Sequence, residues 1–451
     1  MPKWSLEVVC YFDCRVMAHP HFPNTQMVVK VNPILKTWWK DIQKNRELEA
    51  NELLGGLTAL ISVESDRHLI KALLKFWDTE RLVFKFRDFE LTPTIEEVGG
   101  FMGLAYKELE MIVPHKPSPR SFLKQMGMCY NASLLCLKEG WISLEFLYSR
   151  FGDGEGHQNF HREFACSSAK WERYCLNAFD VALLGSLVFP RERGKIHTGL
   201  CYVVRMLARG RKTLVPMILA EILKALTACT KGKRYFEGCN FLLQLWAVEH
   251  FYQRANKVDI IRGTMGNKII NHPLRMKHFI SPVGTKDWFT YLKERSAVEI
   301  QWKYYWLKPR RAIIRGNELY FIELIGLNGV QPYAPLRVLR KFGQIQMIPL
   351  RSHMSHYGYD FGSELPQVNT ILRRWKNVIT IDVQEHRPFC TPEYYVWLLE
   401  DAEHRDLSEG GLPGFGDEKE RRWARNLLNT DYDITPEMKK QIVPNIGEQH
   451  D

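Results

Sequence analysis

The sequence lacks any apolar run of the about 18 residues that a membrane-spanning helix requires. Its longest candidates are interrupted by Asp180 in one case and by Glu221 and Lys224 in the other. A secretory signal peptide is also absent, because Asp13 and Arg15 interrupt the first apolar stretch before any small-residue cleavage site. We therefore expect an intracellular protein that crosses no membrane.

Cysteine is present, but the spacings that carry cysteine chemistry are missing. The ten cysteines include no C-x-x-C pair, and none stands in zinc-finger spacing with histidines. Thiols of an intracellular protein stay reduced. The sequence therefore predicts neither a disulfide framework nor a structural zinc site.

Signatures of common catalytic sites are missing as well. The chain has no G-x-S-x-G elbow, no H-E-x-x-H helix and no Gly-rich phosphate loop after a strand, and Gly263–Lys268 is only superficially similar to such a loop. A pyridoxal phosphate enzyme needs a Schiff-base lysine and a phosphate-binding loop, and no residue fits either role. We predict no catalytic residue, no cofactor and no bound metal.

What the chain does have is material for a large interior and an excess of positive charge. Of its 451 residues, 45% are apolar, which excludes a mainly disordered protein. The net charge is +11, but residues 400–451 carry thirteen acids and seven bases, so residues 1–399 carry +17. A basic body suits acidic partners. We expect protein partners, with nucleic acid as the second class that the charge allows, and the sequence does not decide the oligomeric state.

Residues 76–104, FWDTERLVFKFRDFELTPTIEEVGGFMGL, join a predicted strand to a predicted helix start. Leu82–Arg87 comes close to the alternation typical of a half-buried strand. Thr94 then stands where it can cap a helix, and Glu97 three residues later can bond back to it. Glu96 and Glu97 also lie at the positive end of the new helix dipole. We interpret these residues as a helix start and not as an acid/base pair.

Apolar residues at helical spacing dominate the rest of the chain, so we predict a mainly α, multi-helix globular domain with two or three short β pairings. Its centre is predicted to be a helical hairpin, Leu214–Cys229 and Cys239–Arg254. Arg311–Leu327 is predicted to be β-rich, with a turn at Arg315–Asn317 between its strands, and Leu336–Phe342 is predicted to be a short helix. The expected divisions are a leader (1–32), the helical domain (33–405), and an acidic linker with a terminal helix (406–451).

Two segments gather acids and histidines. The first lies in and after a Gly-rich loop and contains Asp153, Glu155, His157 and His161. Carboxylates and imidazoles are usual ligands of divalent cations, but the spacing matches no known metal motif. The second places His353 and His356 near Asp360 and supplies two zinc ligands at most. We interpret the first segment as a solvated hinge and the second as a turn.

The candidate residues for contact with a partner or with nucleic acid are two groups of cations, Lys231, Lys233 and Arg234, and Lys308, Arg310 and Arg311. Where cations and aromatic residues are interleaved, the cations can neutralise phosphates and the aromatic rings can stack on bases. Beside the second group, however, Trp302, Tyr305 and Trp306 have the spacing of one helix face, which favours core packing. The cations then form a surface patch or a weak nuclear-import signal.

Three motifs, in order, resemble the plant mobile domain family, which is also labelled aminotransferase-like. They are F-x-F-x-x-F-E-L-T-P-T-I-E-E-V-G-G-F-M-G-L from Phe84, N-F-L-L-Q-L-W from Asn240 with Glu249-His250, and R-V-L-R-K-F-G from Arg337 with Gln346 and Pro349. The similarity covers residues 70–400 and departs at Lys341, where glutamine is common. The long coiled-coil tail is also missing here.

The resemblance implies a domain associated with transposable elements and with host genes derived from them. Such host proteins are nuclear and are linked to silencing, gene expression and meristem maintenance. We therefore expect a non-enzymatic, element-derived interaction protein of the nucleus, with the cytoplasm as the alternative location. Two alternatives stay open: an enzyme of mobile-element origin with a dispersed acidic and histidine site at Asp153, Glu155 and Asp360, and a decayed element fragment.

Overall fold

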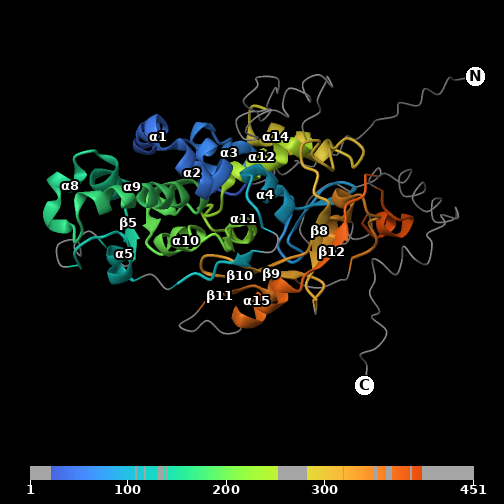
Figure 1. The fold of residues 1–451 in the computed structure, drawn as a ribbon. Coiled ribbons are helices and arrows are strands. Elements are labelled where there is room, and N and C mark those ends of the chain that lie inside the picture. The colour runs from blue at the N-terminus through green and yellow to red at the C-terminus, as the bar shows by residue number, and fades with distance from the viewer. Residues whose placement is uncertain are drawn as a thin grey trace, which may run out of the picture.

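The computed structural model describes residues 22–106, 109–115, 118–130, 137, 140–251, 282–317, 319–349, 354–361, 368–385 and 389–398. Its helical elements (Figure 1) are α1 (Pro33–Asn45), α2 (Glu47–Leu54), η1 (Gly55–Ser62), α3 (Arg67–Leu73), α4 (Ile95–Met102), α5 (Pro119–Gln125), α7 (Leu144–Leu147), η3 (Tyr148–Gly152), α8 (Gly156–Asn159), η4 (His161–Glu163), α9 (Ser168–Leu183), η5 (Leu184–Val188), η6 (Glu192–Gly194), α10 (Leu200–Leu207), α11 (Val215–Thr230), α12 (Asn240–Phe251), α14 (Thr285–Glu294), η7 (Pro335–Phe342), η8 (Met354–Tyr357) and α15 (Val368–Lys376).

The strands are β1 (Trp77–Asp78), β2 (Val83–Lys85), β3 (Glu90–Leu91), β4 (Glu110–Met111), β5 (Trp141–Ile142), β6 (Ile196–His197), β7 (Lys212–Thr213), β8 (Arg311–Arg315), β9 (Ile322–Ile325), β10 (Gly329–Tyr333), β11 (Tyr359–Asp360) and β12 (Ile379–Asp382). In the described residues they form five sheets of two or three strands. The prediction of a mainly α fold with short strand pairings is confirmed, although the pairings exceed the two or three expected.

The helices α11 and α12 lie at the centre of the molecule (Figure 1), so both helices of the predicted hairpin are present. Every residue of α12 is buried, so this helix has neighbours all round. The helix α3 packs against α12, while α11 contacts α4 and the strands β9 and β10. These two central helices therefore bring the N-terminal helices and the later strands into one core.

The predicted helix start at the end of residues 76–104 is confirmed. The Thr94 hydroxyl accepts a hydrogen bond from the Glu97 N–H at 3.2 Å, and the Glu97 carboxylate accepts one from the Thr94 N–H at 2.9 Å. The strand before it is shorter than predicted. Only Val83–Lys85 is β2, which lies between β1 and β3, and Val83 is buried together with Phe84.

The strands after residue 310 pair differently from the prediction. The segments on either side of Arg315–Asn317 are strands, but β8 pairs antiparallel with β12 and β9 pairs antiparallel with β10. The reason is where each strand buries its apolar side chains. Ala312 and Ile314 of β8 pack against η7, whereas β9 lies against α11. Burial of two different faces therefore separates two strands that a tight turn would join.

The described part of the expected leader, residues 22–32, packs against the body. Gln26 forms a parallel bridge with Tyr235, and Met27 and Val31 are buried. The predicted acidic linker and terminal helix at 406–451 lie outside the described residues.

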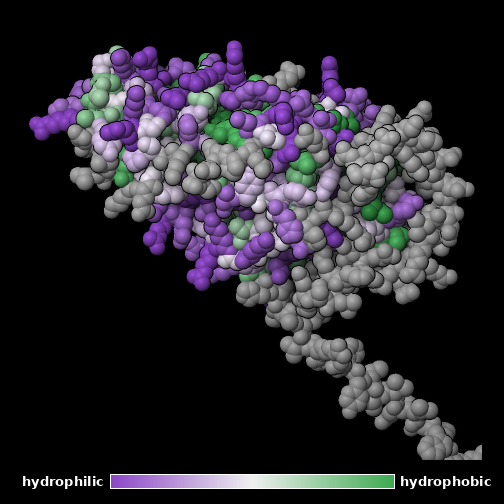
Figure 2. Space-filling view, turned by 90° about the horizontal axis from the view of Figure 1, so that it is seen from below, coloured by the Kyte–Doolittle hydropathy of each residue, from purple (hydrophilic) through white to green (hydrophobic). Residues whose placement is uncertain are grey.

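Figure 2 shows one face of the molecule, on which hydrophilic side chains dominate and the described apolar groups form small, separate areas. Across the described stretches of the chain, no helix combines the length and the apolar character needed to cross a bilayer. For these stretches, the finding agrees with the prediction that the chain has no membrane-spanning helix.

Asp180 is a buried acid without a partner inside α9. Its side chain has no exposed surface, and neither carboxyl oxygen has a hydrogen-bond partner. Burial raises the pKa of Asp180 well above its ordinary value, and Arg46 only partly opposes this. A raised pKa in the folded state means that this carboxyl costs stability as pH rises above the ordinary aspartate pKa. Asp180 therefore destabilises the fold at neutral pH.

We expect Asp180→Leu to raise the free energy of unfolding at neutral pH by about 1–3 kcal/mol, since it removes two unpaired buried oxygens. Urea denaturation measures the change. Asp180→Asn is the matched control: it keeps buried polar atoms but does not titrate, so the contribution of this position should no longer vary with pH. A leucine variant that is less stable than the parent at about pH 4 and at about pH 7 would contradict this account.

Candidate functional site

Three segments that are far apart in the sequence meet at one buried ionic cluster. Glu97 comes from α4, His250 from α12 and Lys341 from η7, and together we call them the Glu97 network. The Lys341 ammonium lies 2.7 and 2.8 Å from the two Glu97 carboxylate oxygens. It also lies 3.0 Å from His250 Nε2, and it donates to the Thr92 carbonyl at 2.7 Å. Glu97, which completes the capping box at the start of α4, is therefore also the acid of a buried ion pair.

Aromatic side chains enclose the Glu97 network. Trp246 Nε1 donates to the Glu97 carboxylate at 3.1 Å, and its ring centroid lies 5.1 Å from the Lys341 nitrogen. The Tyr304 ring centroid lies 4.8 Å from that of His250. The side chains of His250, Lys341 and Glu97 are only 0%, 2% and 6% exposed, so external molecules do not reach these groups in this conformation.

Hydrogen bonds and pKa shifts define the charge state of this network. Burial alone would raise the pKa of Glu97, but Lys341 and His250 outweigh it and hold that pKa at about 2. Burial lowers the pKa of Lys341 to about 8 against the attraction of Glu97. Burial and the Lys341 charge lower the pKa of His250, whose Nδ1 donates to the Gln301 carbonyl at 2.6 Å. At neutral pH one carboxylate faces one ammonium, and the imidazole is neutral and accepts from Lys341.

The lowered pKa of Glu97 makes this network a source of acid sensitivity. A carboxyl with a depressed folded-state pKa contributes stability above its ordinary pKa, and that stability is lost as pH falls toward about 2. We expect the stability difference between the parent and Glu97→Gln to shrink by about 2 kcal/mol from about pH 6 to about pH 3. Denaturant titrations of both proteins across this range measure it. A difference that stays constant with pH would show that Glu97 does not carry the effect.

The other two glutamates of the same motif are also held by structural contacts. Glu90 pairs with Arg337 at 2.5 Å, and both side chains are nearly fully buried. Glu96 accepts a hydrogen bond from the Ile313 N–H of β8 at 2.9 Å. The interpretation of Glu96 and Glu97 as helix-start residues is therefore sound but incomplete, since each also fixes a distant segment. Nothing in the sequence around these glutamates predicts which distant residues they contact. The one indication is that charged residues interrupt otherwise apolar motifs.

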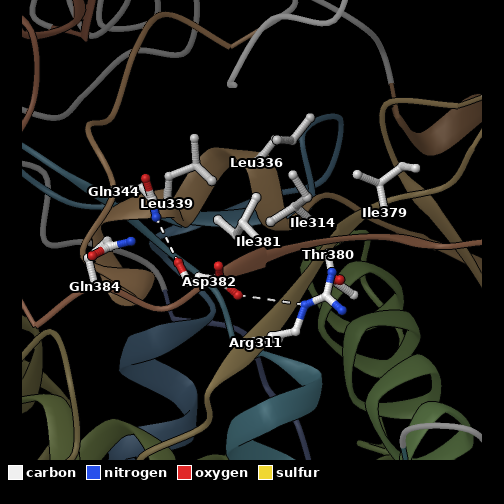
Figure 3. Close-up of a pocket in the computed structure, with 10 residues that line it drawn as sticks. All are labelled: Arg311, Ile314, Leu336, Leu339, Gln344, Ile379, Thr380, Ile381, Asp382 and Gln384. Atoms are coloured by element: carbon white, nitrogen blue, oxygen red, sulfur yellow. Dashed lines mark hydrogen bonds and ion pairs between the residues drawn. The ribbon is translucent and has the colours of Figure 1, made fainter. Parts of the chain in front are cut away.

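An accessible cavity lies on the other side of η7, between this helix and the paired strands β8 and β12. It has a volume of about 310 Å³, and we call it the η7 cavity. Its lining residues (Figure 3) are Arg311, Ile314, Leu336, Leu339, Gln344, Ile379, Thr380, Ile381, Asp382 and Gln384. Five of these are aliphatic and the others are polar or charged, so the cavity combines an apolar wall with hydrogen-bonding groups.

The structure brings one of the predicted contact residues to this cavity. Arg311 lines it and pairs with Asp382 at 3.7 Å, with both side chains mostly exposed. Lys308 and Arg310 are also exposed, just before β8. This group therefore forms an accessible cationic border beside the η7 cavity.

The other predicted group lies on a different element. Lys231, Lys233 and Arg234 are exposed in the turn after α11, where Lys233 pairs with Glu237 at 2.8 Å. The Arg234 carbonyl accepts from the Gln26 N–H at 2.7 Å, which places this turn beside the N-terminal segment. This group therefore lies on a different segment from Lys308, Arg310 and Arg311, which stand at the start of β8.

The predicted helix face near Lys308 is not a helix, but its packing is partly as expected. Residues 297–306 form turns and bends, and their aromatic rings pack on different partners, with Tyr304 and Trp306 against Phe101. Trp302 is buried and contacts Phe89, whereas Tyr304 and not Tyr305 is the buried tyrosine. Core packing therefore accounts for Trp302 without a base-stacking role.

The first acidic and histidine segment does not gather into a site. His157 bonds the Cys166 carbonyl at 3.2 Å and stacks on Phe164, while His161 bonds the Gln158 carbonyl at 3.1 Å. Asp153 accepts from the N–H of Glu155 in its own loop. Over the described ranges, no three His, Cys, Asp or Glu residues are placed to hold a metal ion.

The second segment is only partly described, since His353 lies outside the described residues. His356 is exposed in η8, and Asp360 of β11 pairs with Lys224. Figure 1 shows α8 at one end of the molecule and β11 near the middle, so Asp153 and Glu155 lie apart from Asp360.

The comparison with protein families covers most of the chain. The model of a domain of unknown function, DUF7745, matches residues 35–403. The chain belongs to this family. No curated protein and no solved structure matches the chain. The DUF7745 region contains both the Glu97 network and the η7 cavity.

Proposed function

We propose that this member of the DUF7745 family is a non-enzymatic, transposable-element-derived interaction protein of the nucleus, acting in gene expression, silencing or meristem maintenance. The resemblance of its three motifs to the plant mobile domain supplies the biological setting. The observation that carries the molecular part is the Glu97 network, in which the charged residues of all three motifs bind one another inside a sealed core. Groups held in this way stabilise a scaffold and are not available to a substrate.

The dispersed acidic and histidine site of the enzymatic alternative receives no support from the geometry. Asp153 and Glu155 lie beside α8, whereas Asp360 pairs with Lys224 on α11. A two-carboxylate or carboxylate–imidazole mechanism needs its groups around one reacting centre. The accessible features are instead the η7 cavity and the exposed cations beside it, which suit recognition of another macromolecule.

The test is localisation and affinity capture of the full chain in plant cells, with an unrelated tagged protein of similar charge as the control. We expect a nuclear signal and a reproducible set of protein partners retained as salt is raised, because apolar contacts are insensitive to salt. Partners lost steeply with salt would instead indicate contacts made mainly by charge, either to phosphates or to acidic side chains. A cytoplasmic protein that recovers nothing beyond the control would overturn the proposal.

A further inference from the structure

The two-stranded sheet of β8 and β12 is open over a short stretch of its β12 edge, which ends where the Gln384 N–H donates to the Phe342 carbonyl at 2.9 Å. The Val383 N–H donates to the Arg310 carbonyl, and Ile381 pairs with Ala312. Since bonding direction alternates along antiparallel strands, the backbone groups of Thr380 and Asp382 point away from β8. Gln344 donates to the Asp382 carbonyl at 2.8 Å. Among the described residues, the N–H and C=O of Thr380 and the N–H of Asp382 are left without a partner.

The opposite edge of this sheet is closed. By the same alternation the Ile313 N–H points away from β12, and there it donates to the buried Glu96 carboxylate. Among the described residues, the β12 edge is therefore the better place for an added strand. Unpaired backbone groups on an edge are the usual template for pairing with another chain.

The η7 cavity lies beside this open edge. Figure 3 shows Ile314, Ile379 and Ile381 directed toward Leu336 and Leu339, on the side of the strands opposite Arg311 and Asp382. A strand paired with β12 alternates its side chains between these two sides. Every second side chain would lie against the apolar wall of the cavity, and the intervening ones would face Arg311 and Asp382.

The charges around the sheet determine which residue types an added strand can carry at the positions that do not face the apolar wall. Residues 301–317 contain five cations and no acid, and Lys308, Arg310 and Arg311 are exposed. Within residues 379–385, the acids are Asp382 and Glu385. An added strand with acidic residues on this side gains attraction, whereas a basic one is repelled.

We propose that the β12 edge and the η7 cavity form a docking site for an extended peptide of another protein, with apolar residues alternating with Asp or Glu. The inference rests on the proposed role in protein interaction and names the chemistry of the partner. Backbone hydrogen bonds to Thr380 hold the peptide, the cavity takes its apolar side chains, and Arg310 and Arg311 attract its acids.

The test measures binding of a fluorescein-labelled hexapeptide of alternating glutamate and isoleucine to the full chain by anisotropy. We expect saturable binding that Thr380→Pro weakens at least about tenfold, because proline removes only the outward N–H of an edge strand. Thr380→Val keeps that N–H and should bind within about twofold of the parent. Arg310→Glu with Arg311→Glu should weaken binding at least about tenfold at low salt and less at high salt.

Two changes to the ligand keep the test decisive if Thr380→Pro does not fold. An N-methylated peptide, which donates no backbone hydrogen bonds, and a lysine–isoleucine peptide should both bind at least about tenfold more weakly than the glutamate peptide. Equal binding of all three peptides, or no binding of the glutamate peptide, would overturn the docking site. If full-chain capture still recovers nuclear partners in that case, the proposed function survives and only this site is rejected.

The same experiments distinguish other segments that could occupy the β12 edge. Residues 431–435, DYDIT, also alternate acidic and apolar residues. If Tyr432→Asp with Ile434→Asp in the full chain raises peptide affinity at least about tenfold, the chain's own segment holds the edge and the proposed partner is wrong. A dimer in sedimentation that Thr380→Pro dissolves would assign the edge to a second copy and would equally overturn the proposal.

Discussion

Replacing Lys341 with methionine is expected to lower the free energy of unfolding by about 3–5 kcal/mol. Methionine has a similar length and is apolar, so the packing volume changes little. What changes is charge compensation: the Lys341 ammonium is the cation that faces the buried Glu97 carboxylate, at 2.7 Å. Without it Glu97 must take up a proton, or His250 must become charged inside the core, and both are costly.

The matched control is the double variant Glu97→Gln with Lys341→Met, which removes both charges and keeps a polar side chain at the capping position. We expect it to recover most of the lost stability, because a neutral pair carries no desolvation penalty. Denaturant midpoints of the four proteins in the cycle give the coupling energy. In the Lys341→Met variant, NMR titration of His250 should also show a raised pKa. A single variant as stable as the parent would mean that the Glu97–Lys341 pair contributes nothing.

Local patterns were enough to predict individual elements of this fold. Thr94 and Glu97 form the predicted capping box because capping depends on residues three apart in the sequence. The helices α11 and α12 follow from long apolar segments on either side of a Lys- and Gly-containing turn. Gly343 ends η7 with φ of 71°, as a glycine after a short helix predicts.

Pairing between distant segments was not predictable in the same way. Nothing near Glu97 in the sequence indicates a buried lysine 244 residues later. The turn at Arg315–Asn317 suggested pairing of β8 with β9, but burial against η7 and α11 directed each strand to a different partner. Burial in the folded chain thus determines the partner of Glu97 and the pairing of β8 and β9. Residue spacing along the chain predicts the helices.

The cations of η7 illustrate the same limit of local reasoning. Charged residues are usually exposed, so R-V-L-R-K-F suggests a surface helix. Arg337, Arg340 and Lys341 are nevertheless all buried. Arg340 lies over the Trp302 ring at 4.0 Å, and the other two pair with acids of the segment before and within α4. One side of η7 therefore contacts the start of α4, and its other side lines the η7 cavity.

Arg337→Met is expected to destabilise the fold by about 3–5 kcal/mol, because it leaves Glu90 buried without its cation. In the pair the Arg337 and Glu90 side chains are 4% and 0% exposed, so water cannot solvate the remaining carboxylate. The second oxygen of Glu90 already lacks a hydrogen-bond partner, which leaves no alternative donor in place. Thermal or urea unfolding at neutral pH measures the loss.

Arg311→Met supplies the matched control for this prediction, since it deletes the same chemical group from an ion pair whose side chains are 61% and 78% exposed. Exposed pairs contribute little, so we expect a change of at most about 0.5 kcal/mol. The double variant Glu90→Gln with Arg337→Met should be more stable than Arg337→Met alone, because it removes the uncompensated charge. If Arg337→Met and Arg311→Met cost the same, burial does not set the strength of these pairs. Packing of η7 against the start of α4 would then depend on its aromatic contacts, such as Arg340 on Trp302 and Arg337 on Trp397.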